Sequence, residues 1–237
     1  DRFDRDLDDI FAVQDEVTAE IISALKVKLS ADEQVQVSHR STQHVEAYDT
    51  MLRARDLIIS GTESSMVQAR ILIQRGLEDD PGFAGAMAGM AFTFIGQFAN
   101  QWGDNHRDAI IEAERWAAKA IATDDREIMA WMSMGVVRIW QNRLEDAREA
   151  ANRMRELSPN SVDGLRMLGN IENYSGNPRE AIDILEECMR LDPHGPSLGF
   201  HVLGQAWFVL GEWAKAEEQF RPRIAREPDT DSSYVFL

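Results

Sequence analysis

A period of about 34 residues runs through the second half of the chain and limits the folds open to it. Proline, glycine and alanine recur together at spacings of 34 and then 35 positions. The residues are Pro159, Pro193 and Pro228; Gly135, Gly169 and Gly204; and Ala147, Ala181 and Ala216. Three independent markers with one period are typical of a repeat architecture, in which each unit is stable only when stacked on its neighbours.

Each unit of this period predicts two helices joined by a short turn. In the third unit, the apolar periodicity predicts a first helix over 128–141, a turn at 142–143 and a second helix over 144–157. Proline cannot continue a helix, so Pro159 marks where the second helix ends. The fourth and fifth units predict the same arrangement.

Small residues are expected where the backbone turns or where two helices approach closely. We expect Gly135 and Ala147 to be small because the two helices of the third unit cross at these positions. Gly176 and Gly211 fall in the turns of the next two units, where a positive φ costs little only for glycine. The sequence therefore predicts closely packed helix pairs.

At these spacings the chain resembles the tetratricopeptide-repeat family. The signature residues are Trp131, Met134, Gly135, Ala147, Ala151 and Pro159 in the third unit; Leu165, Leu168, Gly169, Gly176, Ala181 and Pro193 in the fourth; and Phe200, Leu203, Gly204, Gly211, Trp213, Ala216, Phe220 and Pro228 in the fifth. The resemblance implies an all-α fold, a right-handed superhelix of antiparallel helix pairs. It also implies about five repeats over 44–230 and the start of a truncated sixth over 231–237.

Two earlier units match the repeat less well. The first keeps Ala69 and Pro81 but predicts about three extra turn residues. The second has Asp125 where proline is usual and carries an insert over 96–108. The stretch 82–103 has no charged residue over a length that could cross a bilayer, but its glycines, its polar residues and its place in the repeat favour a buried helix.

The N-terminal segment 1–30 predicts an amphipathic helix, which a polar linker over 31–43 follows. Apolar residues recur at a helical spacing at Ile10, Val13, Val17, Ile21 and Leu25. The stretches DRFDRDLDDIFAVQDEVTAEI and AYDTMLRAR resemble the junction and first repeat after a TolB-like domain in bacterial class III adenylate and guanylate cyclases and related transcriptional regulators. The resemblance implies that a cyclase or DNA-binding domain precedes this chain, which begins without Met.

The sequence carries no motif for catalysis or for binding a cofactor. It has no Gly-rich phosphate loop, no paired Cys or His ligands and no Ser nucleophile motif. Asp4, Asp6 and Asp8 have the spacing of a calcium loop, but Asp9 replaces the required glycine, so an acidic helix start is the better interpretation. We predict a chain that is not an enzyme and holds no cofactor or metal.

The charge and residue composition limit the kinds of molecule that the chain is expected to bind. The 41 acidic and 25 basic residues give a net charge of −16, which argues against binding nucleic acid or inserting into an anionic membrane. A single cysteine, Cys188, excludes an internal disulfide, and its apolar helical face predicts a small buried hydrophobe. Trp131 and Trp213 are expected in the repeat core. With no signal peptide in view, we expect a soluble, cytoplasmic protein.

The resemblance implies a peptide-binding groove lined by the first helix of each unit. Its positions fall on Tyr48, Met51, Arg55, Phe92, Ile95, Met129, Met132, Val136, Ile139, Arg166, Asn170, Asn173, His201, Gln205 and Phe208. The N-terminal half is apolar and rich in Met, which suits adaptable packing, and the C-terminal half offers hydrogen-bond donors. Arg166 with Asn170 resembles the family's clamp for a peptide carboxylate.

Three functions stay open at this point. The first is a protein–protein interaction and scaffold module of a larger bacterial signalling protein, a nucleotide cyclase, that binds a peptide, a protein or another domain of its parent. The second is the repeat region of a transcriptional regulator. The third is a spacer or dimerisation arm without a ligand, whose apolar groove is covered by the helix at 8–29 or by a second chain. Apolar residues near both ends, including Phe11 and Phe236, favour a homodimer.

Overall fold

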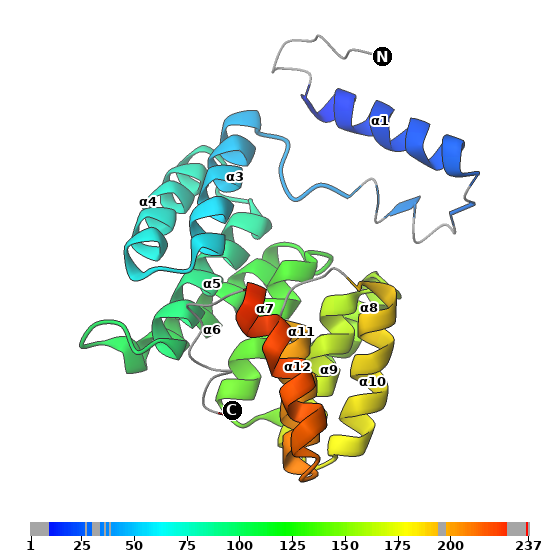
Figure 1. Cartoon of the computed structure of the whole chain (residues 1–237). Helices are drawn as coiled ribbons and strands as arrows, with labels where there is room; N and C mark the ends of the chain where they lie inside the picture. Colours follow the sequence, from blue (N-terminus) through cyan, green and yellow to red (C-terminus); the bar gives the residue numbers. More distant parts are fainter. Residues whose placement is uncertain are drawn as a thin grey trace. The chain divides into compact units, whose positions relative to one another are not determined.

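The computed structural model describes residues 10–26, 28–29, 34–35, 37, 39–193, 198–226 and 236. These residues form eleven α-helices and no β-strand, so the predicted all-α class is confirmed for them. The chain divides into two compact units, 1–133 and 134–237, and each folds around its own packed helices. The helices carry the labels of Figure 1.

The first unit is built from helix pairs. It contains α1 (Ile10–Leu25), α3 (Val45–Ser60), α4 (Glu63–Asp79), α5 (Ala84–Ala99) and α6 (His106–Thr123), and it ends within α7 (Ile128–Trp140). Helix α3 packs beside α4, and α5 packs beside α6, as the repeat predicts (Figure 1).

The extra residues of the first repeat lengthen its helices, and the prediction of extra turn residues is wrong. Helices α3 and α4 have 16 and 17 residues, and only Gly61 and Thr62 separate them. Gly61 has a left-handed conformation, with φ of 67°, and Thr62 accepts a capping hydrogen bond from the Ser65 backbone. A left-handed glycine favours the end of a helix, and a capping threonine favours the start of the next one. Gly61 and Thr62 therefore limit the turn between α3 and α4 to two residues.

The second unit continues the same plan. It contains the end of α7, then α8 (Leu144–Leu157), α9 (Val162–Tyr174), α10 (Pro178–Leu191), α11 (Leu198–Val209) and α12 (Trp213–Arg226). Helix α9 packs on α10, and α11 packs on α12. The helices predicted over 128–141 and 144–157 are confirmed to within one residue. Cys188 is buried, as expected of a small hydrophobe.

The repeated glycines lie where a side chain has no room. A Cβ on Gly169 would come within 2.5 Å of Leu185 on α10, and a Cβ on Gly204 within 2.5 Å of Phe220 on α12. Both contacts join the two helices of one repeat, as predicted. Gly135 differs, because its Cβ would first meet Met167 of the following repeat, with the nearest α8 atom, on Ala150, 3.5 Å away. Met167 is long and flexible enough to reach into this space.

The turns within the repeats also follow the prediction. Gly176 and Gly211 have φ of 82° and 77°. In the third repeat Asn142 takes this place with φ of 58°, a conformation that asparagine tolerates better than most residues. Pro159 follows the end of α8 by two residues, and Pro193 follows the end of α10 by two. The period seen in the sequence is therefore a period of turns and helix ends.

An ion pair inside the second unit links two consecutive repeats. Arg148 on α8 pairs with Glu172 on α9, and Asn177 donates a second hydrogen bond of 2.9 Å to the same carboxylate. The Glu172 side chain is 3% exposed. Burial alone would raise its pKa, but the two hydrogen bonds and the charge of Arg148 outweigh burial and hold the pKa of Glu172 below its ordinary value.

The end of the polar linker is fixed to the first unit by three side chains. His39 Nε2 lies 2.7 Å from an Asp124 carboxylate oxygen, and the Thr42 hydroxyl donates to Asp80 at 2.6 Å. The Ser41 hydroxyl accepts a 2.7 Å hydrogen bond from the Gly85 backbone. Residues 39–42 therefore connect the loops that precede α5 and α7.

The structure also tests the predictions made for the stretch 82–103, for the N-terminal helix and for Trp213. Helix α5 is buried along most of its length, and no described helix is long and apolar enough to cross a membrane. Helix α1 ends at Leu25, five residues before the predicted boundary, and Leu25 itself is 67% exposed. Trp213 is 62% exposed, so the prediction that it lies in the core is wrong; its ring stands on the surface against Phe208, 4.9 Å between centroids.

Candidate functional site

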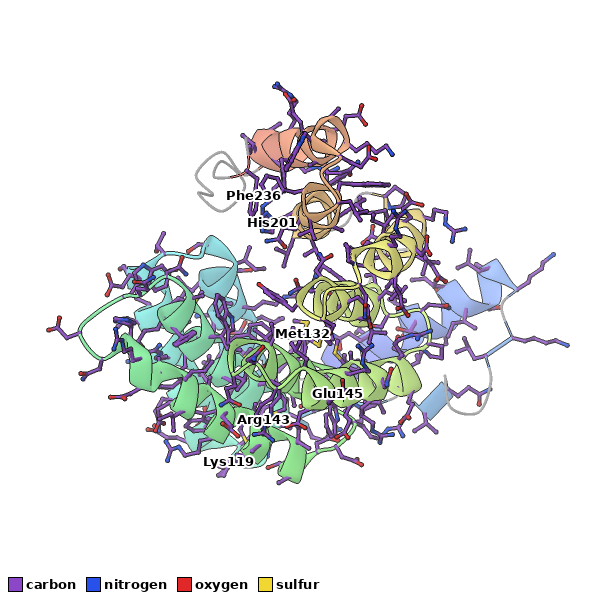
Figure 2. The ribbon with its side chains drawn as sticks, turned by 90° about the horizontal axis from the view of Figure 1, so that it is seen from below. Lys119, Met132, Arg143, Glu145, His201 and Phe236 are labelled. Carbon is purple, nitrogen blue, oxygen red and sulfur yellow. The ribbon has the colours of Figure 1, made fainter. Side chains whose placement is uncertain are left out.

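Four of the predicted groove residues form one stripe along α7. Met129, Met132, Val136 and Ile139 are spaced by three or four residues and therefore share a helix face. Met129 is 42% exposed and the other three are partly exposed, while Ala130, Met134 and Val137 on the opposite side of the helix are buried. Figure 2 labels Met132 on this stripe. Helix α7 thus offers a continuous apolar face with flexible thioether side chains, a surface that can adapt to an apolar partner.

The groove positions of α3 are used within the protein. The ring of Tyr48 contacts Phe11 of α1 with 5.4 Å between centroids, and its hydroxyl accepts a 3.3 Å hydrogen bond from Gln14. Arg40 holds α1 in place by donating to the Phe11 carbonyl at 2.7 Å and pairing with Asp15. At Tyr48, the N-terminal helix therefore covers part of the predicted groove.

The remaining candidates of the first unit differ in exposure. Met51 packs over Gly89, whose Cβ would lie 2.5 Å from the Met51 methyl group, so Met51 belongs to the interface between α3 and α5. Ile95 is 7% exposed and lies in the core. Phe92 is partly exposed and Arg55 is exposed. Besides the α7 residues Met129 and Met132, Phe92 and Arg55 therefore leave surface that a ligand of this unit could contact.

Helix α9 carries three polar candidates with different surroundings. Arg166 forms an ion pair of 2.6 Å with Asp163, one turn earlier on the same helix. The Asn173 side-chain amide donates a 2.9 Å hydrogen bond to the Val202 carbonyl of α11. The side-chain oxygen Oδ1 of Asn173 is buried without a partner among the described residues. Asn170 is partly exposed. The structure thus gives Arg166 a carboxylate partner within the chain, which an incoming peptide carboxylate would have to share or displace.

The candidates on α11 lie beneath an aromatic residue from the C-terminal segment. Phe236 contacts His201 and Phe208, with centroid distances of 5.8 and 5.0 Å, and it stacks on Phe220 at 5.2 Å with a 17° angle between the rings. Figure 2 shows Phe236 next to His201. Gln205 on the same helix is partly exposed. At His201 and Phe208 the chain therefore covers its own candidate surface.

Among the groove candidates, His201 is the one whose pKa lies far from its ordinary value. Burial, with a smaller contribution from the positive charge of Arg223, lowers the pKa of His201 to about 4. A neutral imidazole is therefore the form that this aromatic cluster holds at pH 7. The residue packs against rings and shows no arrangement for acid–base chemistry.

The described residues contain no group of three or more His, Cys, Asp or Glu side chains that could hold a metal ion. Asp4, Asp6 and Asp8, which have the spacing of a calcium loop, lie outside those residues. His39 faces Asp124 and serves to fix the linker. The candidate site is thus a set of helix faces on α3, α5, α7, α9 and α11.

A cavity in the first unit contains none of the groove positions that the sequence predicts. It lies between α4 and α6, where Arg70, Arg75, Arg115 and Trp116 are among the lining residues. An available signal was the spacing of four between aliphatic and basic residues along both helices, as in Ile71 and Arg75. The resemblance to the repeat family does not indicate these residues, because the groove positions that it implies fall on the first helix of each unit.

Comparison with known sequences gives a bacterial relative. No protein-family model matches the chain. "Putative adenylate cyclase 3" of Rhizobium meliloti (strain 1021) is 39% identical over 150 residues, which cover 63% of this chain and 26% of that relative. The chain therefore spans about a quarter of that relative's length. The resemblance to a bacterial adenylate cyclase is confirmed in sequence.

Two solved structures share the fold. A thermophilic TPR (tetratricopeptide repeat) protein of Thermus thermophilus superposes with a TM-score of 0.65 at 16% identity, over 80% of this chain and 95% of that one. The Cut9–Hcn1 hetero-tetramer of the APC/C gives 0.61 at 14% identity, over 96% of this chain and 47% of that one. The chain has the tetratricopeptide-repeat fold.

Proposed function

We propose that this chain is a protein–protein interaction and scaffold module of a larger bacterial signalling protein, a nucleotide cyclase. It binds a peptide or protein segment on the exposed faces of the first helices of its repeats. The 39% identity to a protein named as an adenylate cyclase supports the choice of parent over a transcriptional regulator. The fold supports binding because stacked helix pairs expose extended surfaces that take up peptide segments.

The apolar stripe of α7 is the observation that carries this proposal. Met129, Met132, Val136 and Ile139 expose a row of apolar side chains on a helix whose opposite face is buried. Leaving such a row in water is unfavourable by about 25 cal/mol for each Å² that a partner could cover. Within the first unit, Phe92 on α5 is a further contact that we assign to binding. Within the second unit, Asn170 and Arg166 on α9 are the further contacts that we assign to binding.

The chain covers part of its own candidate surface. A spacer or dimerisation arm without a ligand is therefore the second candidate function. Phe11 covers Tyr48 in the first unit, and Phe236 covers His201 and Phe208 in the second. If α7 were covered in the same way by a second copy of the chain, the stripe would be a dimer interface and no ligand would bind. The two functions differ in whether the stripe is free in solution.

A random peptide display library selected on the purified chain tests the proposal. Selection is carried out in the presence of excess Met132→Asp/Val136→Asp protein, which removes peptides that bind elsewhere. We expect apolar peptides that bind the wild type at least tenfold more tightly than the double variant, and a Glu145→Lys/Glu149→Lys control on α8 that binds as the wild type does. Failure to recover any such peptide, with a monomeric wild type, would leave the spacer function.

A further inference from the structure

A second surface of the first unit has the features of a docking site. An open cavity of about 600 Å³ lies between α4 and α6, which are the second helices of the first two repeats, and residues of α5 also line it. Met90, Phe94 and Trp116 supply its apolar lining, and Arg70, Arg75 and Arg115 contribute three guanidinium groups. Trp, Phe, Met and Arg are the residue types enriched at protein interfaces and at their energetic centres.

Helix α4 presents a stripe that changes from aliphatic to basic. Val67, Ile71 and Arg75 are spaced by four residues, so they share one helix face. Val67 and Ile71 are 50% and 51% exposed. Arg75 is exposed, and it forms no hydrogen bond or ion pair with any other described residue. The helix therefore offers two aliphatic side chains and one uncommitted positive charge in a row.

Helix α6 repeats this order. Ile111, Arg115 and Lys119 are again spaced by four, and Ile111 is 62% exposed. Lys119, labelled in Figure 2, lies 5.0 Å from the centre of the Trp116 ring. The chain reverses direction on each side of α5, so α4 and α6 run parallel. Ile71 and Arg75 of α4 and Arg115 of α6 are among the residues that line the cavity, and Val67, Ile111 and Lys119 continue the same helix faces beyond it.

The charge of the cavity is opposite to that of the chain. Its lining contains Arg70, Arg75 and Arg115 against Glu78 and Glu112, a net charge of +1, whereas the whole chain has a net charge of −16. Arg115 pairs with Glu112 at 2.7 Å, so a partner carboxylate at Arg115 would share or displace that contact. Arg70 is held by hydrogen bonds of 2.8 and 2.9 Å to Thr93 and by the Phe94 ring at 3.9 Å, so its positive charge is fixed at the cavity wall. A concentration of basic groups on an acidic protein selects for a negatively charged partner.

We propose that the cavity between α4 and α6 docks an acidic amphipathic segment of a partner protein. Aliphatic side chains of the segment pack on Ile71, Ile111 and the Trp116 ring, and carboxylates that follow them pair with Arg75, Arg115 and Lys119. This surface uses the second helices of two repeats together with Met90 and Phe94 of α5, and none of the residues assigned above to the binding face. The module can therefore hold two segments at once, one apolar and one acidic.

The test is a second selection from the random peptide library on the whole chain. Counter-selection uses excess Arg75→Glu/Arg115→Glu protein, whose changes are at exposed positions. We expect recovered peptides to combine aliphatic residues with Asp or Glu and to bind the double variant at least tenfold more weakly. Arg179→Glu/Arg190→Glu, a matched pair of exposed changes on α10, leaves the affinity unchanged. Met132→Asp/Val136→Asp also leaves it unchanged, which separates this site from the proposed binding face.

Three results would overturn the proposal. One is that no peptide distinguishes the wild type from Arg75→Glu/Arg115→Glu while both proteins keep the same melting temperature. Another is that the recovered peptides carry no excess of acidic residues. The last is a wild-type dimer that Arg75→Glu/Arg115→Glu dissociates, since the cavity would then hold a second copy of this chain.

Discussion

Leu185 fills the space that a side chain on Gly169 would need. A Cβ built on Gly169 would lie 2.5 Å from Leu185 Cγ, a branched carbon in the fully buried part of the core. The contact ties the first helix of the fourth repeat to its second helix. The same relationship between Gly204 and Phe220 ties the helices of the fifth.

Gly169→Ala is expected to destabilise the protein by about 1–3 kcal/mol, because Leu185 must leave its rotamer or α9 must move away from α10. The loss exceeds the roughly 1 kcal/mol that alanine gains over glycine in an exposed helix. Denaturant unfolding measures it. Ala181→Leu, at a fully buried position of the same crossing, should act in the same direction, and Ala214→Leu at an exposed position should not. Equal midpoints for Gly169→Ala, Ala181→Leu and the wild type would show that this packing is wrong.

Arg148→Met is expected to lower the free energy of unfolding by about 3 kcal/mol at pH 7. It leaves the Glu172 carboxylate, 3% exposed, with Asn177 as its remaining hydrogen-bond donor among the contacts described above. Because the pKa of Glu172 is held low by Arg148, the effect should shrink as pH falls and the carboxylate becomes neutral. The control is Arg221→Met, which removes an exposed pair with Glu217 and should cost less than about 1 kcal/mol. Equal losses for the two variants would contradict a stabilising role for the buried pair.

The acidity of His201 predicts a pH dependence of stability. Its folded pKa of about 4 lies below the ordinary value of 6.5, so between these values the unfolded state binds a proton that the folded state does not. The free energy of unfolding should therefore fall as pH decreases from 6.5 towards 4, by about 2–3 kcal/mol at pH 4.5 from this group alone. Urea unfolding of the wild type and of His201→Gln at pH 7 and pH 4.5 isolates the contribution. An equal change in both proteins would mean that His201 titrates normally.

Removal of Phe236 tests the cover on α11. Phe236→Ala exposes His201 and Phe208, and we expect the pKa of His201 to rise towards 6.5 as its ring gains contact with water. The histidine resonances in an NMR titration report the value directly. Phe98→Ala, in the other unit, is the matched control and should leave the titration of His201 as it is in the wild type. An unchanged titration in Phe236→Ala would show that Phe236 does not shield this site.

Sequence reasoning identified the fold because its signals are local. Gly176, Gly211 and Pro159 each act on the backbone within a few residues, so their period reveals the helix pairs directly. The partner of Gly135 depends on the next repeat, where the flexible Met167 reaches into the crossing, and no pattern within one repeat predicts that contact.

The candidate surface was harder to predict because burial depends on distant segments. Tyr48 and Phe208 have the spacing of groove residues, but Phe11 and Phe236, far away in sequence, pack against them. Met51 also has this spacing, yet the absence of a side chain on Gly89 draws it into the helix interface. The stripe on α7 could be read from spacing alone, since one helix contains all of it.

Photo-crosslinking from α7 shows directly whether the stripe of Met129, Met132, Val136 and Ile139 contacts a partner segment. The photoreactive amino acid p-benzoylphenylalanine replaces Met132 in the larger bacterial protein that we propose contains this chain. The cross-linked peptide is identified by mass spectrometry. We expect a cross-link to one specific segment, from a partner or from another domain of the proposed parent. The cross-link should be lost when Val136→Asp is added and absent when the label replaces Glu145. Cross-links from position 132 that are no more specific than those from position 145 would contradict a binding function for this face.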